Sequence, residues 1–261
     1  MDQKLRYPVV LVHGIMAHDR KGLIDFWGRI PDILRDNGVD LYFGNTDAWG
    51  TYESNAAILK TTVETVLTET GAEKVNIIAH SKGGIDSRFM IWRYDFGNTV
   101  ASLTTISTPH HGAELADYIL DKDIVHTDFV KKIWEVLGEM WGDSNPEMYR
   151  VGNQLTTEHM KEFNKIVIPD EDVYYQSYYT TMRDASDDLW LSETYKYIYS
   201  VSGDNDGIVS ARSATWSDHI TLIPGGISHH EIIDVKKTKI SGIEIPDIYL
   251  ELAVHLYELG F

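Results

Sequence analysis

The residue best placed for chemistry in this sequence is Ser81, which follows an apolar strand pattern at residues 75–79 and precedes a helical pattern. A serine hydroxyl is a weak nucleophile, so it must be exposed, next to a base and near donors for an oxyanion. A sharp turn from strand to helix allows this when the flanking residues are small, as Ala79 and Gly83 are. A serine can also simply cap such a helix. The buried strand and the Gly83-Gly84 pair favour the nucleophile, although Ala79 replaces the first glycine of the usual G-x-S-x-G pattern.

Two backbone N–H groups are candidate donors for that oxyanion. Lys82 follows the serine at the start of the helix, where unpaired N–H groups and the helix dipole favour negative charge. The apolar run VVLVHG ends at His13-Gly14, and Gly14 allows the chain to bend so that the N–H of Ile15 faces the serine. The same residues also suit an ordinary turn at the end of a strand.

An acid and then a base are expected after the serine along the chain. The candidates are Asp206 in SGDNDGIVS and His229 in GGISHHEIID. Together with a serine they would let the imidazole take the hydroxyl proton while the carboxylate orients the ring. Asp-Gly is also a common turn and either histidine can simply lie in a loop. Spacing alone leaves Asp204 and His230 as alternatives.

The elements that must position these residues alternate between strand and helix. Strands are predicted at residues 9–12, 39–43, 75–79, 101–106, 173–179 and 220–223, and helices at residues 26–37, 54–70, 82–94 and 248–259. Residues 187–200 fit both a strand and a helix. The alternation predicts an α/β fold with a mostly parallel, doubly wound sheet that has helices on both faces. From about residue 112 to 170 helical patterns continue without strands, which predicts a helical cap inserted into a single domain spanning residues 1–261.

Composition narrows the class of protein. The 261 residues include no cysteine, which excludes disulfides, thiolate metal sites and a cysteine nucleophile. The formal net charge of −17 argues against a nucleic-acid partner and against docking on anionic membranes through a basic patch. The N-terminus lacks the pattern of a signal peptide, and no apolar run is long enough to span a bilayer. A cytoplasmic location is therefore favoured, with a mature secreted form left open.

Five segments together resemble a known family: PVVLVHG, AHSKGG, ISTPHHG, DNDGIVS and SHHEII. They are similar to bacterial true lipases and esterases of the α/β-hydrolase superfamily, over most of the chain and least across the cap. The resemblance implies the α/β-hydrolase fold, with Ser81 as nucleophile, Asp206 as acid and His229 as base. His229 is preferred to His230 because members of the family have an acidic residue two positions after the catalytic histidine, where this chain has Glu231.

The resemblance also implies roles for two backbone groups and two histidines. The N–H groups of Ile15 and Lys82 match the pair that forms the oxyanion hole in the family. His110 and His111 of the TPHHG turn are expected to position the cap rather than to react.

The resemblance bears on metals as well. Some of these lipases hold zinc in an extra subdomain, which the connection over residues 43–54 is too short to contain, so no zinc is expected. Many bind a structural calcium near the catalytic histidine. In this chain Glu231 matches one calcium ligand, but Lys236 stands where the next acidic ligand is expected. Calcium is therefore not favoured, and no cofactor is required.

The expected function is carboxylic ester hydrolysis by a lipase, as a triacylglycerol lipase or carboxylesterase, through an acyl-enzyme on Ser81. An acyltransferase, a phospholipase or a thioesterase could use the same three residues, and the fold could also serve as a non-catalytic binding module. The expected partner is an acyl ester or lipid, with transient contact with a lipid interface; the oligomeric state is left open. One helical face in the cap could line an acyl-chain pocket and open as a lid, or pack on its own core. It comprises Phe129, Ile133, Trp134, Leu137, Met140 and Trp141.

Overall fold

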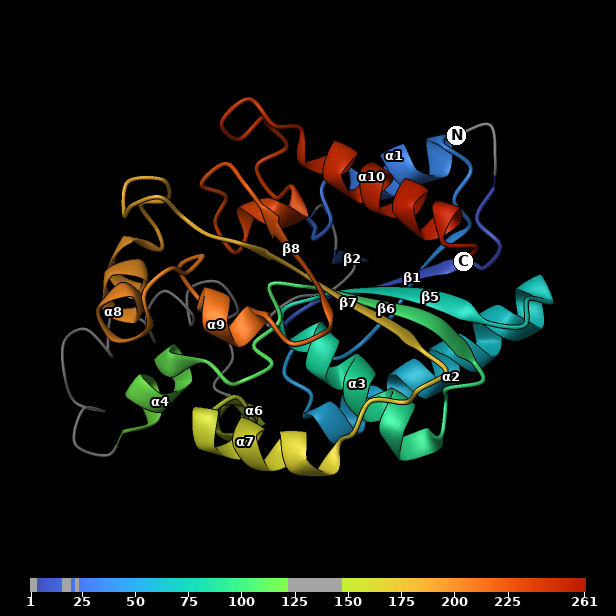
Figure 1. Ribbon diagram of the computed structural model, residues 1–261, viewed down its shortest axis with the longest axis horizontal. Coiled ribbons are helices and arrows are strands. Elements are labelled where there is room, and N and C mark those ends of the chain that lie inside the picture. The colour runs from blue at the N-terminus through green and yellow to red at the C-terminus, as the bar shows by residue number, and fades with distance from the viewer. Residues whose placement is uncertain (1–3, 16–19, 22–23, 122–146) are drawn as a thin grey trace.

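The computed structural model describes residues 4–15, 20–21, 24–121 and 147–261 (Figure 1). A six-stranded sheet runs through it in the order β4-β1-β5-β6-β7-β8, and every neighbouring pair is parallel. The strands are β1 (Val9–Val12), β4 (Leu41–Phe43), β5 (Val75–His80), β6 (Val100–Ile106), β7 (Tyr174–Thr180) and β8 (His219–Ile223). A separate antiparallel pair consists of β2 (Arg20–Lys21) and β3 (Ile24–Asp25).

Helices cover both faces of the main sheet, α1 with α10 on one face and α2 with α3 on the other (Figure 1). Their bounds are α1 (Ile30–Asp36), α2 (Tyr52–Thr70), α3 (Lys82–Tyr94) and α10 (Ile245–Glu258). Strand β1, which lies between β4 and β5, contributes to both cores, because successive side chains of a strand point to opposite faces. Val9 and Leu11 pack with α1 and α10, whereas Val10 and Val12 pack with α2 and α3. The predicted α/β fold with a doubly wound parallel sheet is confirmed.

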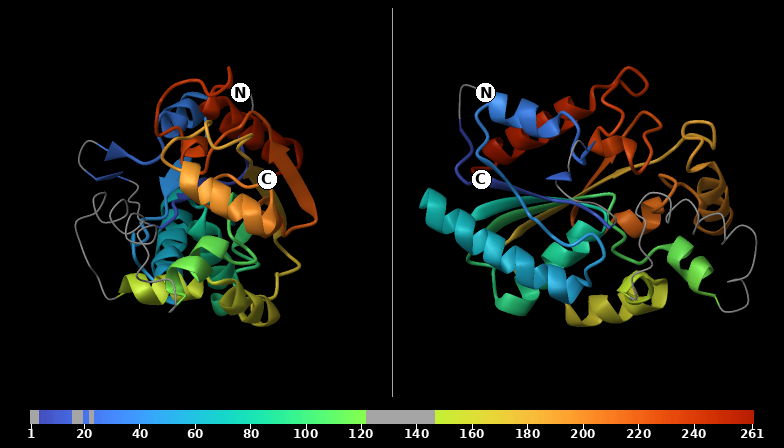
Figure 2. Two further views of the ribbon diagram at one scale, coloured as in Figure 1. Left: turned by 90° about the vertical axis from the view of Figure 1, so that its left-hand side faces the viewer. Right: turned by 180° about the vertical axis from the view of Figure 1, so that it is seen from behind.

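Further helices gather beyond the carboxyl ends of the strands, at the left of Figure 1 and at the right of the rear view in Figure 2. They are α4 (Glu114–Leu120), α6 (Glu147–Gln154), α7 (Thr157–Ile166), α8 (Ser192–Ser202) and α9 (Ala211–Ala214). The first three follow β6 in the chain and the other two follow β7. Loops that leave the strands at this end are the ordinary place for a binding or catalytic site in an open α/β sheet.

Helix α1 departs most from its predicted range, while α2 and α10 begin two and three residues earlier than expected. The helix expected at residues 26–37 begins only at Ile30, because Pro31 lies in its first turn and has no N–H to bond back to an earlier turn. Residues 187–200, which fit both structures, contribute to helix α8. Its buried side chains recur at helical spacing, at Thr194, Tyr195 and Ile198. Within the described ranges, no helix combines the length and apolar character needed to cross a membrane.

Candidate active site

Ser81 stands on the turn that joins β5 to α3, at a positive φ of 54°. Residues other than glycine rarely adopt that conformation, so surrounding contacts must hold it. The N–H of Ser81 donates to the carbonyl oxygen of Ile106 (2.9 Å), and its own carbonyl oxygen accepts from Thr108 Oγ1 (2.8 Å). A Cβ on Gly83 would lie 2.5 Å from the carbonyl oxygen of His13, so a glycine is needed for α3 to approach β1 this closely.

His229 lies between Ser81 and Asp206. Nε2 of His229 is 3.0 Å from Ser81 Oγ, and Nδ1 is 2.8 Å from Asp206 Oδ2. All three residues are nearly buried, with exposed fractions of 6% for Ser81, 8% for His229 and 1% for Asp206. Of the two alternatives, Asp204 is exposed and His230 points toward a different carboxylate. The structure therefore brings together the three residues that the resemblance implies.

The carboxylate of Asp206 is held from several directions. Its Oδ1 accepts the backbone N–H groups of Ile208 (3.0 Å) and Val209 (2.8 Å), which leaves Oδ2 for His229. The carbonyl oxygen of Asp206 also accepts the backbone N–H of His229 (2.9 Å). Because an ionised carboxylate only accepts, Nδ1 of His229 carries the proton and Nε2 of the neutral ring faces the serine hydroxyl. This tautomer is the one that can take the proton of Ser81.

The loop that contains Gly14 lies directly against the serine. A Cβ on Gly14 would lie 2.8 Å from Cβ and 3.3 Å from Oγ of Ser81. Ile15 follows this glycine at the end of the described range 4–15, and Lys82 provides the first N–H of α3 on the other side. The two predicted oxyanion donors thus belong to segments that both adjoin the hydroxyl.

His80, which sequence interpretation did not single out, supports the backbone of His229. Its Nε2 donates to the carbonyl oxygen of His229 (3.0 Å), and the two ring centroids are 4.6 Å apart. Nδ1 is then unprotonated, and it has no hydrogen-bond partner among the described residues. Burial, followed by the proximity of the His229 ring, holds the pKa of His80 well below its usual 6.5, so the His80 ring stays neutral. The only available signal was its place next to the serine in AHSKGG.

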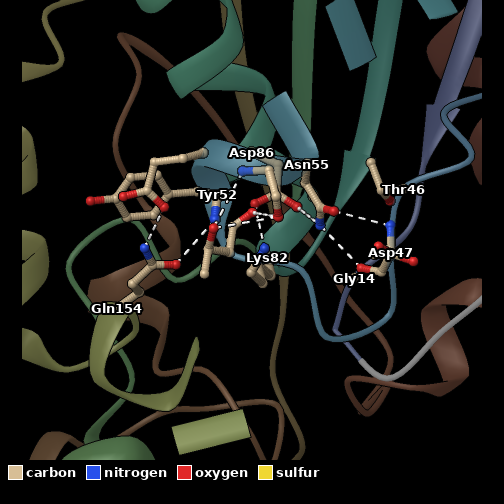
Figure 3. Close-up of polar contacts among 12 residues, drawn as sticks. Gly14, Thr46, Asp47, Tyr52, Asn55, Lys82, Asp86 and Gln154 are labelled. Atoms are coloured by element: carbon tan, nitrogen blue, oxygen red, sulfur yellow. Dashed lines mark hydrogen bonds and ion pairs between the residues drawn. The ribbon is translucent and has the colours of Figure 1, made fainter. Parts of the chain in front are cut away.

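Lys82 and Asp86, in the first turns of α3, form a buried ion pair (Figure 3). Lys82 Nζ donates to Asp86 Oδ1 (2.5 Å), and each side chain is only 2% exposed. Asp86 Oδ2 accepts from Asn55 Nδ2 (2.8 Å), and Asn55 Oδ1 accepts the N–H of Asp47 (3.0 Å). Burial raises the pKa of Asp86, and the Lys82 ammonium opposes that rise. These bonds connect the start of α3 to α2 and to the loop after β4. They occupy the Lys82 side chain, so the backbone N–H of Lys82 is the group that stays a candidate oxyanion donor.

Replacing Asp86 with alanine is expected to lower the free energy of unfolding by about 3–5 kcal/mol, because the Lys82 ammonium would be buried without its counter-charge. Glu64→Ala is the matched control: Glu64 pairs with Lys60 at the same i,i+4 spacing, but the two side chains are 52% and 35% exposed. The control should cost less than about 0.5 kcal/mol. Urea unfolding followed by circular dichroism measures both, and similar losses would show that burial of the pair does not matter.

His110 connects the sheet to a helix of the cap region. Its Nδ1 accepts from Arg88 Nη1 (3.1 Å), and Arg88 Nη2 donates to Asn164 Oδ1 on α7 (2.8 Å). Asn164 Nδ2 in turn donates to the carbonyl oxygen of His110 (2.8 Å). The ring stacks on Trp216 at 4.8 Å, and burial, then the charge of Arg88, keeps the pKa of His110 well below its usual range. His110 therefore fastens α7 to α3, while its neighbour His111 is exposed.

The predicted cap is described only in part. Helices α4, α6 and α7 fall within residues 112–170. The six apolar residues expected to line an acyl-chain pocket lie outside the described residues: Phe129, Ile133, Trp134, Leu137, Met140 and Trp141. Their role as a lid stays a prediction.

The residues around Glu231 do not fit a calcium ion of the kind that many members of the resembled family bind. Glu231 Oε2 accepts a hydrogen bond from the backbone N–H of Ser228 (3.0 Å), and Glu231 Oε1 accepts one from Lys236 Nζ (2.6 Å). Asp188 Oδ2 lies on the other side of the same ammonium, at 3.6 Å. Calcium would need such oxygens at about 2.3–2.6 Å, and the ammonium takes that position. Across the described part of the chain, no group of three or more His, Asp or Glu residues is arranged to hold a metal ion.

Comparison with known sequences identifies a matching protein family and several related proteins. The model of the palmitoyl protein thioesterase family matches residues 8–157. A triacylglycerol lipase of Pseudarthrobacter phenanthrenivorans is 39% identical over 127 residues, which cover 47% of this chain and 39% of the relative. Triacylglycerol lipase 2 of Saccharomyces cerevisiae is 28% identical over 258 residues, covering 91% of this chain and 75% of the relative. The chain thus spans only 39% and 34% of the length of two bacterial lipases that it matches, although it spans most of the yeast protein.

Two solved structures have a similar fold. The mature form of the Bacillus licheniformis lipase BlEst2 superimposes with a TM-score of 0.72 at 22% identity, over 95% of this chain and 91% of that one. Lipase 1 of Pelosinus fermentans superimposes with a TM-score of 0.69 at 19% identity, over 97% and 98% of the two chains. At these identities the likeness concerns the arrangement of strands and helices.

Proposed function

This chain belongs to the palmitoyl protein thioesterase family and has the α/β-hydrolase fold, and we propose that it is a serine hydrolase of carboxylic esters, acting as a triacylglycerol lipase or carboxylesterase. The observation that carries this proposal is the line of hydrogen bonds from Ser81 Oγ through the ring of His229 to Asp206. The triacylglycerol lipases among its relatives support an ester of a lipid as the substrate. Such a substrate would bring the protein into transient contact with a lipid interface.

In the proposed reaction, Ser81 Oγ attacks the ester carbonyl while His229 Nε2 takes the hydroxyl proton. Asp206 stabilises the imidazolium that forms. The developing oxyanion is bound by the N–H groups of Ile15 and Lys82, each of which typically contributes about 3–4 kcal/mol to such a step. His229 then returns its proton to the leaving alcohol, and the acyl group stays on Ser81. A water molecule then attacks the acyl carbon while the same imidazole takes its proton. The acyl–Oγ bond breaks, the acid leaves and the imidazolium returns the proton to Ser81 Oγ, so these steps use only groups of this chain and water.

Thioester hydrolysis is the second candidate, and the family match favours it. A thioester passes through the same acyl-enzyme, with a thiol in place of the alcohol as the leaving group. The residues around Ser81 are therefore compatible with both reactions, and a direct competition between an oxygen ester and a thioester of the same acyl group separates them.

The test is turnover of p-nitrophenyl esters of increasing chain length beside the matching acyl thioesters, with Ser81→Ala as the background. The proposal predicts that the wild-type protein cleaves the oxygen esters with a higher kcat/KM than the thioesters and that the variant cleaves neither. A higher kcat/KM for the thioesters would assign the second candidate instead. Ester release by the wild type no faster than by Ser81→Ala would contradict both. Addition of a short alcohol distinguishes a hydrolase from an acyltransferase, because a transferase would form the new ester.

A further inference from the structure

Two buried carboxylates hold the short segment that carries His229. Asp188 Oδ2 accepts from Ser228 Oγ (2.8 Å) and lies 3.0 Å from His230 Nε2, so one carboxylate contacts both neighbours of the histidine. Glu231 Oε2 accepts the backbone N–H of Ser228 (3.0 Å). The exposed fractions of Asp188 and Glu231 are both 3%. The position of the His229 ring therefore depends on keeping these two acids together.

Two buried acids placed side by side need a positive charge, because their mutual repulsion is poorly screened away from water. Lys236 supplies one: its Nζ is 2.6 Å from Glu231 Oε1 and 3.6 Å from Asp188 Oδ2. Burial alone would raise the pKa of Asp188, but the bonds from His230 and Ser228 and the charge of Lys236 hold it well below its usual range. Partial burial would lower the pKa of Lys236, but the two acids raise it. Asp188 and Lys236 thus stay charged near neutral pH.

A separate contact holds the far side of the same segment. The carboxylate of Asp234, which follows the short 3₁₀ helix Glu231–Ile233, accepts from Nε (2.8 Å), Nη2 (2.7 Å) and the backbone N–H (2.8 Å) of Arg29. This anchor to the start of α1 involves neither Lys236 nor the two acids. A change at Lys236 should therefore shift the His229 segment without unfolding it.

We infer that Lys236 is a positioning residue, a built-in cation that takes the place of a divalent metal ion between Asp188 and Glu231 and holds His229 within reach of Ser81. The inference rests on the proposed roles of Ser81 and His229. It explains why the residues here do not fit calcium: one ammonium, carried by the segment itself, already joins the two acids. The wild-type protein is then expected to position His229 without any metal.

The first test compares variants by kinetics and by the rate at which a fluorophosphonate labels Ser81, a reaction that needs a correctly placed imidazole. Lys236→Met keeps the alkyl stem but removes the charge, and it should lower kcat and the labelling rate by about 10- to 100-fold with little change in KM. Lys236→Arg restores a cation and should keep most of both rates. Lys239→Met is the matched control, because Lys239 is 61% exposed and pairs with Glu244, away from the two acids.

The second test asks whether a metal can replace the ammonium. In Lys236→Ala, millimolar Ca²⁺ should restore the labelling rate, and Tb³⁺ should bind with emission sensitised by Trp190, a residue whose backbone N–H donates to Asp188 Oδ1 (3.0 Å). The wild type should neither bind Tb³⁺ at this position nor respond to Ca²⁺ or EDTA, in labelling rate or in Tm.

The outcomes separate this inference from the proposed function. If the wild type is not labelled at Ser81 under any condition, the proposed function fails and this inference fails with it. If the wild type is labelled but Lys236→Met is labelled equally fast, the inference alone is overturned. Loss of wild-type labelling in EDTA, with recovery in Ca²⁺, would also overturn it, because a metal would then be doing what is assigned to Lys236.

Discussion

Replacing Ser81 with alanine is expected to lower kcat for hydrolysis of a short p-nitrophenyl ester by roughly 10⁶-fold, with KM nearly unchanged. The expected loss is this large because the hydroxyl is the atom that forms the covalent bond, while the surfaces that bind the ester stay in place. Alanine also leaves the packing unchanged, because it keeps the Cβ of Ser81, against which Gly14 lies. Steady-state kinetics of the purified variant, corrected for the uncatalysed rate, measures the effect.

Ser87→Ala is the matched control for that variant. Ser87 lies on α3, the helix that follows Ser81; it is fully buried and donates through Oγ to the carbonyl oxygen of Gly83 (2.7 Å). Its hydroxyl belongs to the helix and not to the line of bonds with His229, so the control should keep kcat within a few-fold. A comparable loss in both variants would mean that Ser81 matters only for the integrity of α3.

Replacing Asp206 with asparagine is expected to lower kcat by roughly 10⁴-fold while leaving the fold intact. The physical reason lies in the two N–H groups, of Ile208 and Val209, that bond to Oδ1. The amide oxygen must keep accepting those bonds, so the amide NH₂ group turns toward Nδ1 of His229. The imidazole then has to accept at Nδ1 and carries its proton on Nε2, where it can no longer take the proton of Ser81.

Asp204→Asn removes the same charge two residues away and serves as the control. Asp204 is exposed, and its carbonyl oxygen accepts the N–H of Ala211 (2.8 Å), a bond that the variant keeps. The control should retain near wild-type kcat. If Asp204→Asn lost as much activity as Asp206→Asn, a general effect of charge would explain both, and the assigned role of Asp206 would be wrong.

Much of the fold could be predicted because its signals are local. The run VVLV alternates between two cores and predicts a strand buried on both sides, and the spacing of apolar residues marked α2, α3 and α10. Helix α1 begins later than the pattern from Phe26 predicts, because Pro31 has no N–H to bond to an earlier turn. Residues 187–200 stayed ambiguous because aromatic and β-branched residues at positions such as Tyr195 and Ile198 suit either structure.

The candidate site was predictable in part. Small residues around Ser81, and the order of acid and base after it, are properties of the sequence. The choice of Asp206 over Asp204 depends on which carboxylate the loop turns toward His229, and spacing does not contain that information. The contacts that support the site are even harder to predict from the sequence. Two examples are the hydrogen bond from His80 to the His229 backbone and the hydrogen bond from Ser228 to Asp188. Each joins segments that are distant in the chain, and no local sequence pattern indicates it.

The most direct test of the nucleophilic role of Ser81 is mass spectrometry of the protein acid-quenched during turnover of a p-nitrophenyl ester. The expected result is a single acyl group, carried on the peptide that contains Ser81 and missing from Ser81→Ala. An acyl group on another residue, or turnover with no acylated protein at any time point, would contradict the proposed mechanism.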